Sequence, residues 1–231
     1  MRKLTKSLVL IVWNELEGCK ADVPKIDRTP FNEVFAIDGG SNDGTVHYLE
    51  NEGIPVYRQR KRSLNAAYAD AAHFSKCEAI VVFFPKATLD ATVLGELCRQ
   101  VDAGYDLVVA SRNMPGAHNE EDEKHFKPRK WGVALLSLTA ALIWRREGWR
   151  IRDVLHGVKA YTKQAYYLMR VSDMGVTVDL EMTVRAYRLR IPRNEFPVSE
   201  KARPHGETRF KIWPTGKRLA KFLWGECFRK I

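Results

Sequence analysis

The chain has 231 residues, 45% of them hydrophobic, which is enough for one large domain or two small ones with a sizeable core. Its four cysteines lie far apart and form no CxxC pair, which argues against a zinc site and a disulfide framework and favours a reducing cytosol. The net charge is +10, and nine basic against two acidic residues place +7 of it within residues 201–231. Such a tail indicates a phosphate-rich partner, either anionic lipid, nucleic acid or a nucleotide, unless it is only a solvated basic face.

The amino-terminal residues carry no signal-peptide pattern. The apolar run in MRKLTKSLVLIVWNE is short, ends at Asn14 and Glu15, and has no small-residue cleavage site. The longest apolar run, residues 131–144, has 14 residues and is too short to span a bilayer. The sequence therefore predicts a cytoplasmic protein.

The first half of the chain alternates between strand and helix patterns. Short, β-branched, nearly continuous apolar runs predict strands, and segments with helical spacing lie between them. The strands are predicted at 7–13, 33–38, 54–58, 79–84 and 106–111, and the helices at 44–52, 64–75 and 91–104. This order predicts an α/β fold with a doubly wound, mostly parallel sheet, in which ligands bind beyond the carboxyl ends of the strands. Asp38, residues 85–87 and residues 111–112 lie at such ends.

The second half is less regular. Residues 113–130 are polar, with an acidic run from Glu120 to Glu123, and are typical of a surface loop or a lid. Helices are predicted at about 130–147, 162–170 and 178–189, with a short segment at 151–161 and an edge strand at 191–200. We divide the chain into one domain, 1–213, with a nucleotide-binding half (1–112) and an acceptor-side half (113–213), and a basic helix at 214–231.

The carboxyl-terminal helix has a short apolar face. Leu219, Phe222 and Leu223 share that face with Glu226, and the polar side is basic, with Lys217, Arg218, Lys221 and Arg229. Two interpretations are balanced. The helix either lies on an anionic membrane surface or packs its apolar face on the core of the protein.

The stretch AIDGGSNDGT (36–45) is the most informative motif. A strand ends on Asp38, glycines allow a tight turn, and Ser41 and the residues after it can cap the next helix. The carboxylate can accept hydrogen bonds from a base or ribose, and a turn without a ligand is the alternative.

Together with other segments, this motif resembles the family 2 glycosyltransferases of GT-A fold, and among them the polyprenyl-phosphate (dolichol-phosphate) sugar transferases. The resemblance covers roughly residues 7–215, and the order and spacing of its segments make it specific. These segments are VWNE (12–15), DGGSNDGT (38–45), SLNAAYADAA (63–72), YDLVVASR (105–112), DVLHGVKAYTKQA (153–165), VDLEMTVRAYRLRIPRNEFPV (178–198) and RPHGET (203–208).

The resemblance assigns candidate roles by position. Two departures are notable: Gly39 stands where the family often has a second aspartate, and His156 replaces a serine. One of two carboxylates on a predicted helix should face the site as a general base, with Glu181 the better match to the motif and Asp179 the alternative. The nucleotide-binding candidates are Asn14, Glu15, Asp38, Gly39, Gly40 and Arg112, and the acceptor-side candidates are Asp153, His156, Arg203 and His205.

The main departure follows the strand at 79–84. There the family places Asp-x-Asp, which holds Mg²⁺ or Mn²⁺ on the donor diphosphate, whereas this chain has Pro85, Lys86 and Ala87. Three interpretations follow. Lys86 and other basic groups replace the cation in catalysis; or a metal is recruited by other carboxylates, such as Asp90, Asp179 or Glu181; or the protein binds its ligand without catalysis.

The sequence thus predicts a glycosyltransferase that takes a nucleotide-sugar donor. The acceptor is either a lipid phosphate, reached at a membrane surface, or a glycan hydroxyl, and nucleic acid is not an expected partner. No metal ligand and no cofactor are assigned. The alternative is a catalytically silent nucleotide-sugar-binding or scaffold protein of the same fold. A nucleotidyltransferase is disfavoured because NELEG (14–18) is acidic where that class has a Gly-rich basic loop.

Overall fold

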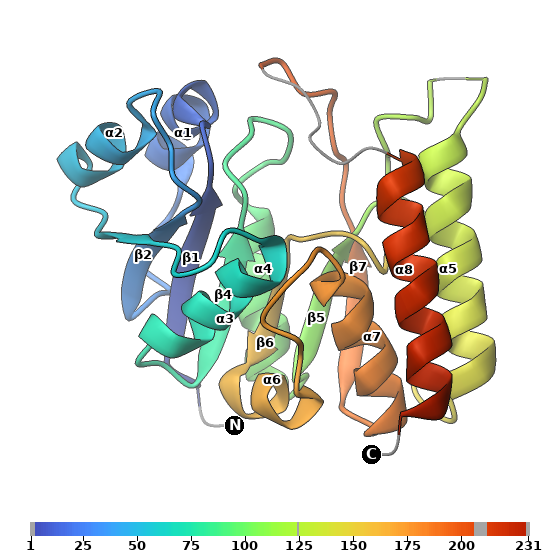
Figure 1. The fold of residues 1–231 in the computed structure, drawn as a ribbon. Helices are drawn as coiled ribbons and strands as arrows, with labels where there is room; N and C mark the ends of the chain where they lie inside the picture. The colour runs from blue at the N-terminus through green and yellow to red at the C-terminus, as the bar shows by residue number, and fades with distance from the viewer. Residues whose placement is uncertain (1–2, 124, 206–211, 230–231) are drawn as a thin grey trace.

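The computed structural model describes residues 3–123, 125–205 and 212–229 and contains a seven-stranded mixed sheet, shown in Figure 1. The order across the sheet is β3-β2-β1-β4-β6-β5-β7. All neighbouring strands pair in parallel except β6, which is antiparallel to both β4 and β5. The strands are β1 (Lys6–Val12), β2 (Glu33–Asp38), β3 (Val56–Arg58), β4 (Ala79–Phe83), β5 (Leu107–Ser111), β6 (Lys159–Thr162) and β7 (Arg193–Pro197).

Helices cover both faces of this sheet, because successive side chains of a strand point to opposite sides. Val9 and Ile11 of β1 belong to one buried cluster, with residues of α3 and α5 to α8, whereas Leu8 and Leu10 belong to another, with residues of α1, α2 and α4. The predicted α/β doubly wound class is therefore confirmed. The helices are α1 (Leu16–Asp22), a 3₁₀ turn (Val23–Lys25), α2 (Thr45–Asn51), α3 (Leu64–Phe74), α4 (Val93–Asp102), α5 (Pro128–Trp144), α6 (Lys163–Met169), α7 (Val178–Arg188) and α8 (Ile212–Phe228).

Three elements were not predicted. The helix α1 has only seven residues, and the 3₁₀ turn Val23–Lys25 comes directly after it. The strand β6 has four residues and carries a lysine, Lys159, whose side chain is buried and paired with Asp179. A charged residue in so short a segment hides the strand pattern, and only the tertiary pairing makes the position tolerable.

The helix α8 packs on the protein itself. Leu219 and Leu223 are buried in the cluster that contains the α5 and α7 residues, and Phe222 packs against it. Glu226 is also buried and accepts hydrogen bonds from Arg185 and Arg188. The core-docking interpretation of the apolar face is therefore confirmed. Within the described part of the chain, no helix is long and apolar enough to cross a membrane.

Candidate functional site

A cavity of about 840 Å³ lies beyond the carboxyl ends of the parallel strands. We call it the cleft. The ends of β1, β4 and β5 contribute to its walls, together with α5, the start of α7 and the first turns of α8. Among the predicted site residues, its lining includes Glu15, Gly39, Lys86, Arg112, His156, Asp179 and Arg203.

The loop after β4 points its lysine into this cleft. Ala87 has a left-handed backbone, with φ of 56°, and its N–H donates to Asp22 Oδ2 at 2.8 Å. Helix α1 holds the loop from the other side, because a Cβ on Gly18 would lie 2.2 Å from the carbonyl oxygen of Pro85. An extended segment would turn Lys86 away from the face used by its neighbours, but this turn aims it inward.

The side chain of Lys86 is half-buried, and its surroundings are mixed in charge. Its Nζ lies 4.8 Å from the centre of the Phe84 ring. Burial lowers the pKa of Lys86, the carboxylate of Glu15 opposes this, and the positive charge of Arg203 adds to it. The ammonium is therefore partly desolvated, which strengthens its interaction with any anion that enters.

Arg112 is held by two carboxylates. It forms a bidentate pair with Asp153, at 2.7 and 3.0 Å, and its Nη1 lies 2.8 Å from Glu200 Oε2. Burial alone would raise the pKa of Asp153, but attraction and hydrogen bonds from Arg112 outweigh it and lower the pKa to about 2. Asp153 does not line the cleft, so it orients Arg112 from behind.

Arg203 is paired with Glu15, which lies between β1 and α1, and both line the cleft. Its Nη2 pairs with Glu15 Oε2, and its Nε donates to the carbonyl oxygen of His205 at 2.5 Å. The expected side-chain role of His205 is not supported, because its side chain is exposed and does not line the cleft. The remainder of the RPHGET motif, residues 206–208, lies outside the described residues.

The Asp-Gly-Gly turn is held by its own hydrogen bonds. The Asp38 carboxylate accepts from the N–H of Gly40 at 2.9 Å and from the N–H and hydroxyl of Ser41 at 3.0 and 2.6 Å. Asn14 Oδ1 accepts from the N–H of Asn42, which ties the end of β1 to this turn. Asp38, Gly40 and Asn14 thus shape the wall, and Gly39 is the member of this turn that lines the cleft.

The two candidate bases are placed opposite to expectation. Asp179 lines the cleft, with Lys159 Nζ at 2.6 Å and the Tyr68 hydroxyl at 3.3 Å from its Oδ1. Glu181 does not line it. Its oxygens accept from Asn65, Ser172 and Thr177, and Arg185 lies 2.8 Å away. The preference for Glu181 as the residue that faces the site is therefore wrong, and the physical reason is that its hydrogen-bonding capacity is used inside the fold.

His156 is buried but borders the cleft. Its Nδ1 contacts the carbonyl oxygen of Ala110. Burial, and then repulsion from Arg112, lower the pKa of His156, so that its neutral form prevails at pH 7. A Cβ on Gly157 would lie 2.4 Å from Phe84 Cε2, so the glycine lets this segment pack against the aromatic ring beside Lys86.

The described residues of the cleft offer no suitable ligand set for a divalent cation. Pro85 and Ala87 offer no side-chain oxygen, Asp90 is exposed and accepts from the N–H of Thr92, and Asp179 and Glu181 are paired with cations of the protein. Within the described residues, no three His, Cys, Asp or Glu side chains form a group that could hold a metal. The metal-binding interpretation through these carboxylates therefore does not fit.

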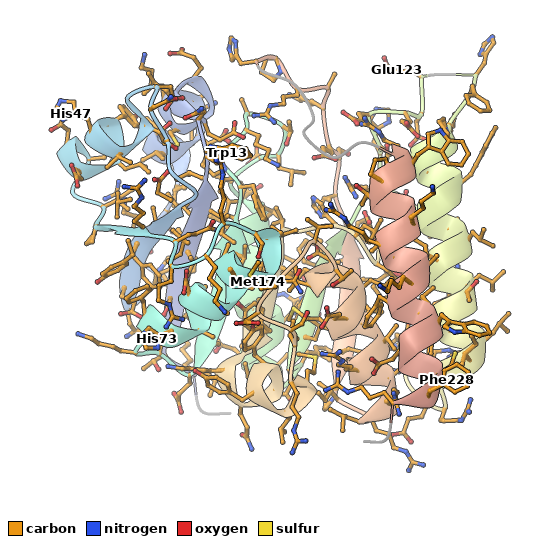
Figure 2. The ribbon with its side chains drawn as sticks, in the orientation of Figure 1. Trp13, His47, His73, Glu123, Met174 and Phe228 are labelled. Carbon is orange, nitrogen blue, oxygen red and sulfur yellow. The ribbon has the colours of Figure 1, made fainter. Side chains whose placement is uncertain are left out.

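Four residues near the cleft were missed by sequence reasoning. Trp13, labelled in Figure 2, lies under the guanidinium of Arg62, with Cζ 3.8 Å from the ring centre, and both line the cleft. The basic run RQRKR (58–62) was a usable signal for Arg62, and Lys159 could have been found as a lysine in an apolar segment. Glu200 carried no signal, because its partner Arg112 is far away in sequence.

Two known proteins are similar in sequence to most of this chain. No protein-family model matches the chain. Glycosyltransferase AglJ of Haloferax volcanii is 25% identical over 198 residues, which are 84% of this chain and 62% of AglJ, so the chain spans less than two thirds of that protein. Polyprenol monophosphomannose synthase of Mycolicibacterium smegmatis is 26% identical over 215 residues, 86% of this chain and 78% of the synthase.

Solved structures share the fold. Glucosyl-3-phosphoglycerate synthase from Mycobacterium tuberculosis, solved with phosphoglyceric acid, has a TM-score of 0.75 at 16% identity and covers 99% of this chain and 81% of its own. The same synthase solved with Mn²⁺, uridine-diphosphate-glucose and glycerol 3-phosphate has a TM-score of 0.74 at 15% identity, over 99% and 82%. The likeness shows a GT-A-like α/β fold.

Proposed function

We propose, on the premise that the chain is an enzyme of the family 2 glycosyltransferase kind with a GT-A fold, that it moves a sugar from a nucleotide-sugar donor to an acceptor in the cleft. The division into a nucleotide-binding half (1–112) and an acceptor-side half (113–213) is part of this proposal. The observation that carries it is a lysine in the cleft, at the position where the family has its metal ligands.

Lys86 is the proposed electrostatic substitute for the cation. When the bond between sugar and diphosphate breaks, negative charge develops on the departing diphosphate, and a preorganised, half-buried ammonium stabilises it. Arg203 and Arg112 border the same space. Arg203 is the more available of the two, because Arg112 is already held by Asp153 and Glu200.

The nucleoside is proposed to lie against the indole of Trp13, beside the Gly39 turn. Both residues line the cleft, and Trp13 packs directly on Gly39, where a Cβ would lie 3.1 Å from Trp13 Cβ. The face of an indole can stack on any base. The guanidinium of Arg62 covers this face, so it would have to move off the indole or stack on the far side of the bound base. The structural neighbours were solved with uridine diphosphate and uridine-diphosphate-glucose, which makes uridine nucleotides the first ligands to test.

The acceptor is proposed to be a lipid phosphate, with a glycan hydroxyl as the alternative. A phosphate is already anionic and attacks without a strong general base, whereas a hydroxyl needs one. Asp179 is the available carboxylate for that role, but its Oδ1 is already engaged by Lys159 Nζ at 2.6 Å. The name of the Mycolicibacterium relative, a polyprenol monophosphomannose synthase, also supports the lipid acceptor. A cytoplasmic protein that attaches to the membrane surface fits this acceptor.

The second candidate is a silent nucleotide-sugar-binding protein. It is favoured by the replaced carboxylates and by the fact that Arg112 and Arg203 are paired with acidic residues of the protein itself. In that case a bound diphosphate would be recognised but its sugar would not be transferred.

Calorimetric titration with uridine and guanosine diphosphates, with and without EDTA, tests the proposal. We expect binding that EDTA does not change, and a loss of about 10- to 100-fold in Lys86→Met, because a hydrogen bond to a charged group contributes about 1.5–3 kcal/mol. Lys76→Met, on the exposed surface, is the matched control and should bind normally. If EDTA abolished binding and Mn²⁺ restored it, the metal-free proposal would be wrong. Tight binding of a nucleotide sugar with no turnover on lipid phosphates or glycans would favour the silent protein.

A further inference from the structure

The exposed apolar side chains are concentrated on one part of the molecule. Among the described residues, ten of the fourteen large hydrophobic residues that are exposed belong to α5, α8 or the segments next to α5. Figure 1 shows α5 and α8 running alongside one another at the edge of the molecule, and both contribute residues to the cleft and to one buried cluster. Surface patches of this extent on a soluble chain mark an interaction site.

The α5 part of this surface is a continuous stripe. Trp131, Leu135, Leu138 and Leu142 are spaced by four, three and four residues, which puts them on one face of the helix. They are 53%, 65%, 43% and 72% exposed. The opposite face carries buried residues such as Ala140, so α5 is apolar on both sides and only one side is covered.

The α8 part is aromatic and basic. Trp213, Trp224 and Phe228 are 82%, 71% and 71% exposed, and the last two rings lie 5.5 Å apart. Phe228 lies at the end of α8 that borders α5 (Figure 2). Lys217 and Lys221 are exposed on the same helix. We call the exposed residues of these two helices the α5–α8 surface.

We propose that the α5–α8 surface docks on an anionic lipid bilayer. The charges decide between a bilayer and a second copy of this chain. Helix α5 contains no Asp or Glu, and the one acidic residue of α8, Glu226, is buried against Arg185 and Arg188. The acidic run before α5 is largely neutralised, because Asp122 pairs with Lys127 and Lys130, and Glu120 with Arg129. Two such surfaces would repel each other, whereas lysines beside exposed tryptophans suit the headgroup region of an anionic membrane.

This surface differs from the apolar face that the sequence of α8 suggested, because Leu219 and Leu223 of that face are buried in the protein. The docking is independent of the proposed transfer reaction. The further consequence, that a lipid phosphate enters the cleft from the bilayer between α5 and α8, rests on the proposed function. Gly132 and Leu136 of α5 and Gly216 and Leu219 of α8 line the cleft on that side.

Flotation of the full chain with vesicles tests the docking without any nucleotide sugar. At low salt we expect binding to vesicles of equal parts phosphatidylglycerol and phosphatidylcholine, weaker binding to pure phosphatidylcholine, and a decrease as salt screens the lysines. The double variant Leu135→Asp/Leu142→Asp should bind the anionic vesicles at least about tenfold more weakly. It removes two apolar groups and adds two negative charges, which the anionic headgroups repel. Leu168→Asp on α6, where the leucine is 59% exposed, is the matched control and should bind like the wild type.

Thermal unfolding and titration with uridine diphosphate should be unchanged in all of these variants. If the aspartate variant fails to fold, the Lys217→Gln/Lys221→Gln variant tests the proposal in its place. This variant should no longer prefer anionic vesicles over pure phosphatidylcholine. The proposal is overturned if the wild type ignores anionic vesicles at low salt, or if both variants bind them as the wild type does. A third outcome would also overturn it. The wild type would be a dimer that binds no vesicles, and the Leu135→Asp/Leu142→Asp variant would be a monomer. If the wild type binds the vesicles but binds no nucleotide, the proposed function is contradicted and the docking proposal is not.

Discussion

The charges in the cleft are balanced by one another before any ligand arrives. Arg203 is paired with Glu15, and Arg112 with Asp153 and Glu200, so a diphosphate has to compete with carboxylates of the protein. Lys86 has Glu15 and Glu200 in its surroundings but makes no ion pair within 4 Å with any described residue. We therefore expect it to be the cation that a diphosphate engages at the lowest energetic cost.

Asp179 distinguishes the two acceptor classes. If the acceptor is a phosphate, Asp179→Asn should change kcat only a few-fold, whereas a hydroxyl acceptor should lose about 10²–10⁴ in kcat with its general base. The substitution also leaves Lys159 buried without its partner, which destabilises by roughly 3–5 kcal/mol. The double variant Asp179→Asn/Lys159→Met removes this penalty, so rates measured in it separate chemistry from folding. A large loss with a lipid phosphate in the double variant would contradict the proposed acceptor.

The pH dependence of stability should report the Asp153–Arg112 pair. The pKa of Asp153 is about 2 in the folded chain, below the ordinary value of 3.8. A carboxyl with a lowered pKa contributes stability that is complete above its unfolded value and is lost as the pH falls towards its folded value. Urea unfolding should therefore show Asp153→Asn to be less stable than the wild type by about 2 kcal/mol at pH 7, with the difference shrinking between pH 4 and pH 2.

The exposed Glu50→Gln is the control for this measurement, and it should show little difference at any pH. A difference between Asp153→Asn and the wild type that stays constant down to pH 2 would mean that packing, not the ion pair, is what the substitution removes.

Single residues were predicted well where a motif fixed their position and poorly where the tertiary structure assigned their partners. Lys86, Arg112 and Arg203 were selected from the sequence and do border the cleft. Glu181 was selected and does not, since its carboxylate is held inside the fold by Ser172, nine residues away, and by Asn65, 116 residues away. No pattern in one sequence reports such a partnership.

At the scale of elements, α1 and the loop after β4 act as a unit. Gly18→Ala would put a Cβ within 2.2 Å of the Pro85 carbonyl oxygen and 2.9 Å of Lys86 Cα, and both are backbone atoms that cannot rotate away. We expect a loss of about 1–3 kcal/mol in the free energy of unfolding, because the packing must shift. Binding of uridine diphosphate should weaken as well, since the loop that aims Lys86 moves.

Gly95→Ala in α4 is the matched control, because a Cβ there meets nothing within 4 Å. It should stabilise the protein by roughly 0.5–1 kcal/mol, as alanine does in a helix interior. Calorimetric unfolding and nucleotide titration of the pair check both statements. If Gly18→Ala behaved like Gly95→Ala, the contact between α1 and the loop would not hold Lys86 in place.

The elements themselves followed from the sequence wherever their pattern was long or strongly apolar. The five predicted parallel strands and the helices at 64–75, 91–104 and 178–189 are present, with ends shifted by a few residues. The missed strand β6 depends on neighbours on both sides, β4 and β5, and its lysine is buried only because α7 brings Asp179 to it. Such a strand is specified by the sheet rather than by its own residues.

At the scale of the molecule, α8 is a structural part of the cleft and the core. Removing residues 212–231 would expose the cluster that Leu219 and Leu223 cover and leave Arg185 and Arg188 without Glu226. We expect a markedly lower Tm and the loss of one wall of the cleft. Loss of vesicle binding by this truncated chain would therefore not identify a membrane contact.

The point variant Glu226→Gln isolates the buried charges. It should destabilise by about 1.5–3 kcal/mol, because Arg188 loses its charged partner while Arg185 keeps Glu181 at 2.8 Å, and it should leave the exposed α5–α8 surface unchanged. Urea unfolding and vesicle flotation of the same sample check the two parts of this prediction. A variant as stable as the wild type would show that α8 is held by its leucines alone.

The antiparallel strand β6 between β4 and β5 has a consequence for synthesis on the ribosome. The strands β3, β2, β1 and β4 can pair as soon as residue 83 has emerged, but β5 has no partner until β6 follows about 50 residues later. At roughly 5–20 residues per second, β5 waits for several seconds with unpaired backbone groups on both edges. The growing chain thus passes through a stage in which half of its sheet is complete and the next strand is a site for mispairing with neighbouring nascent chains.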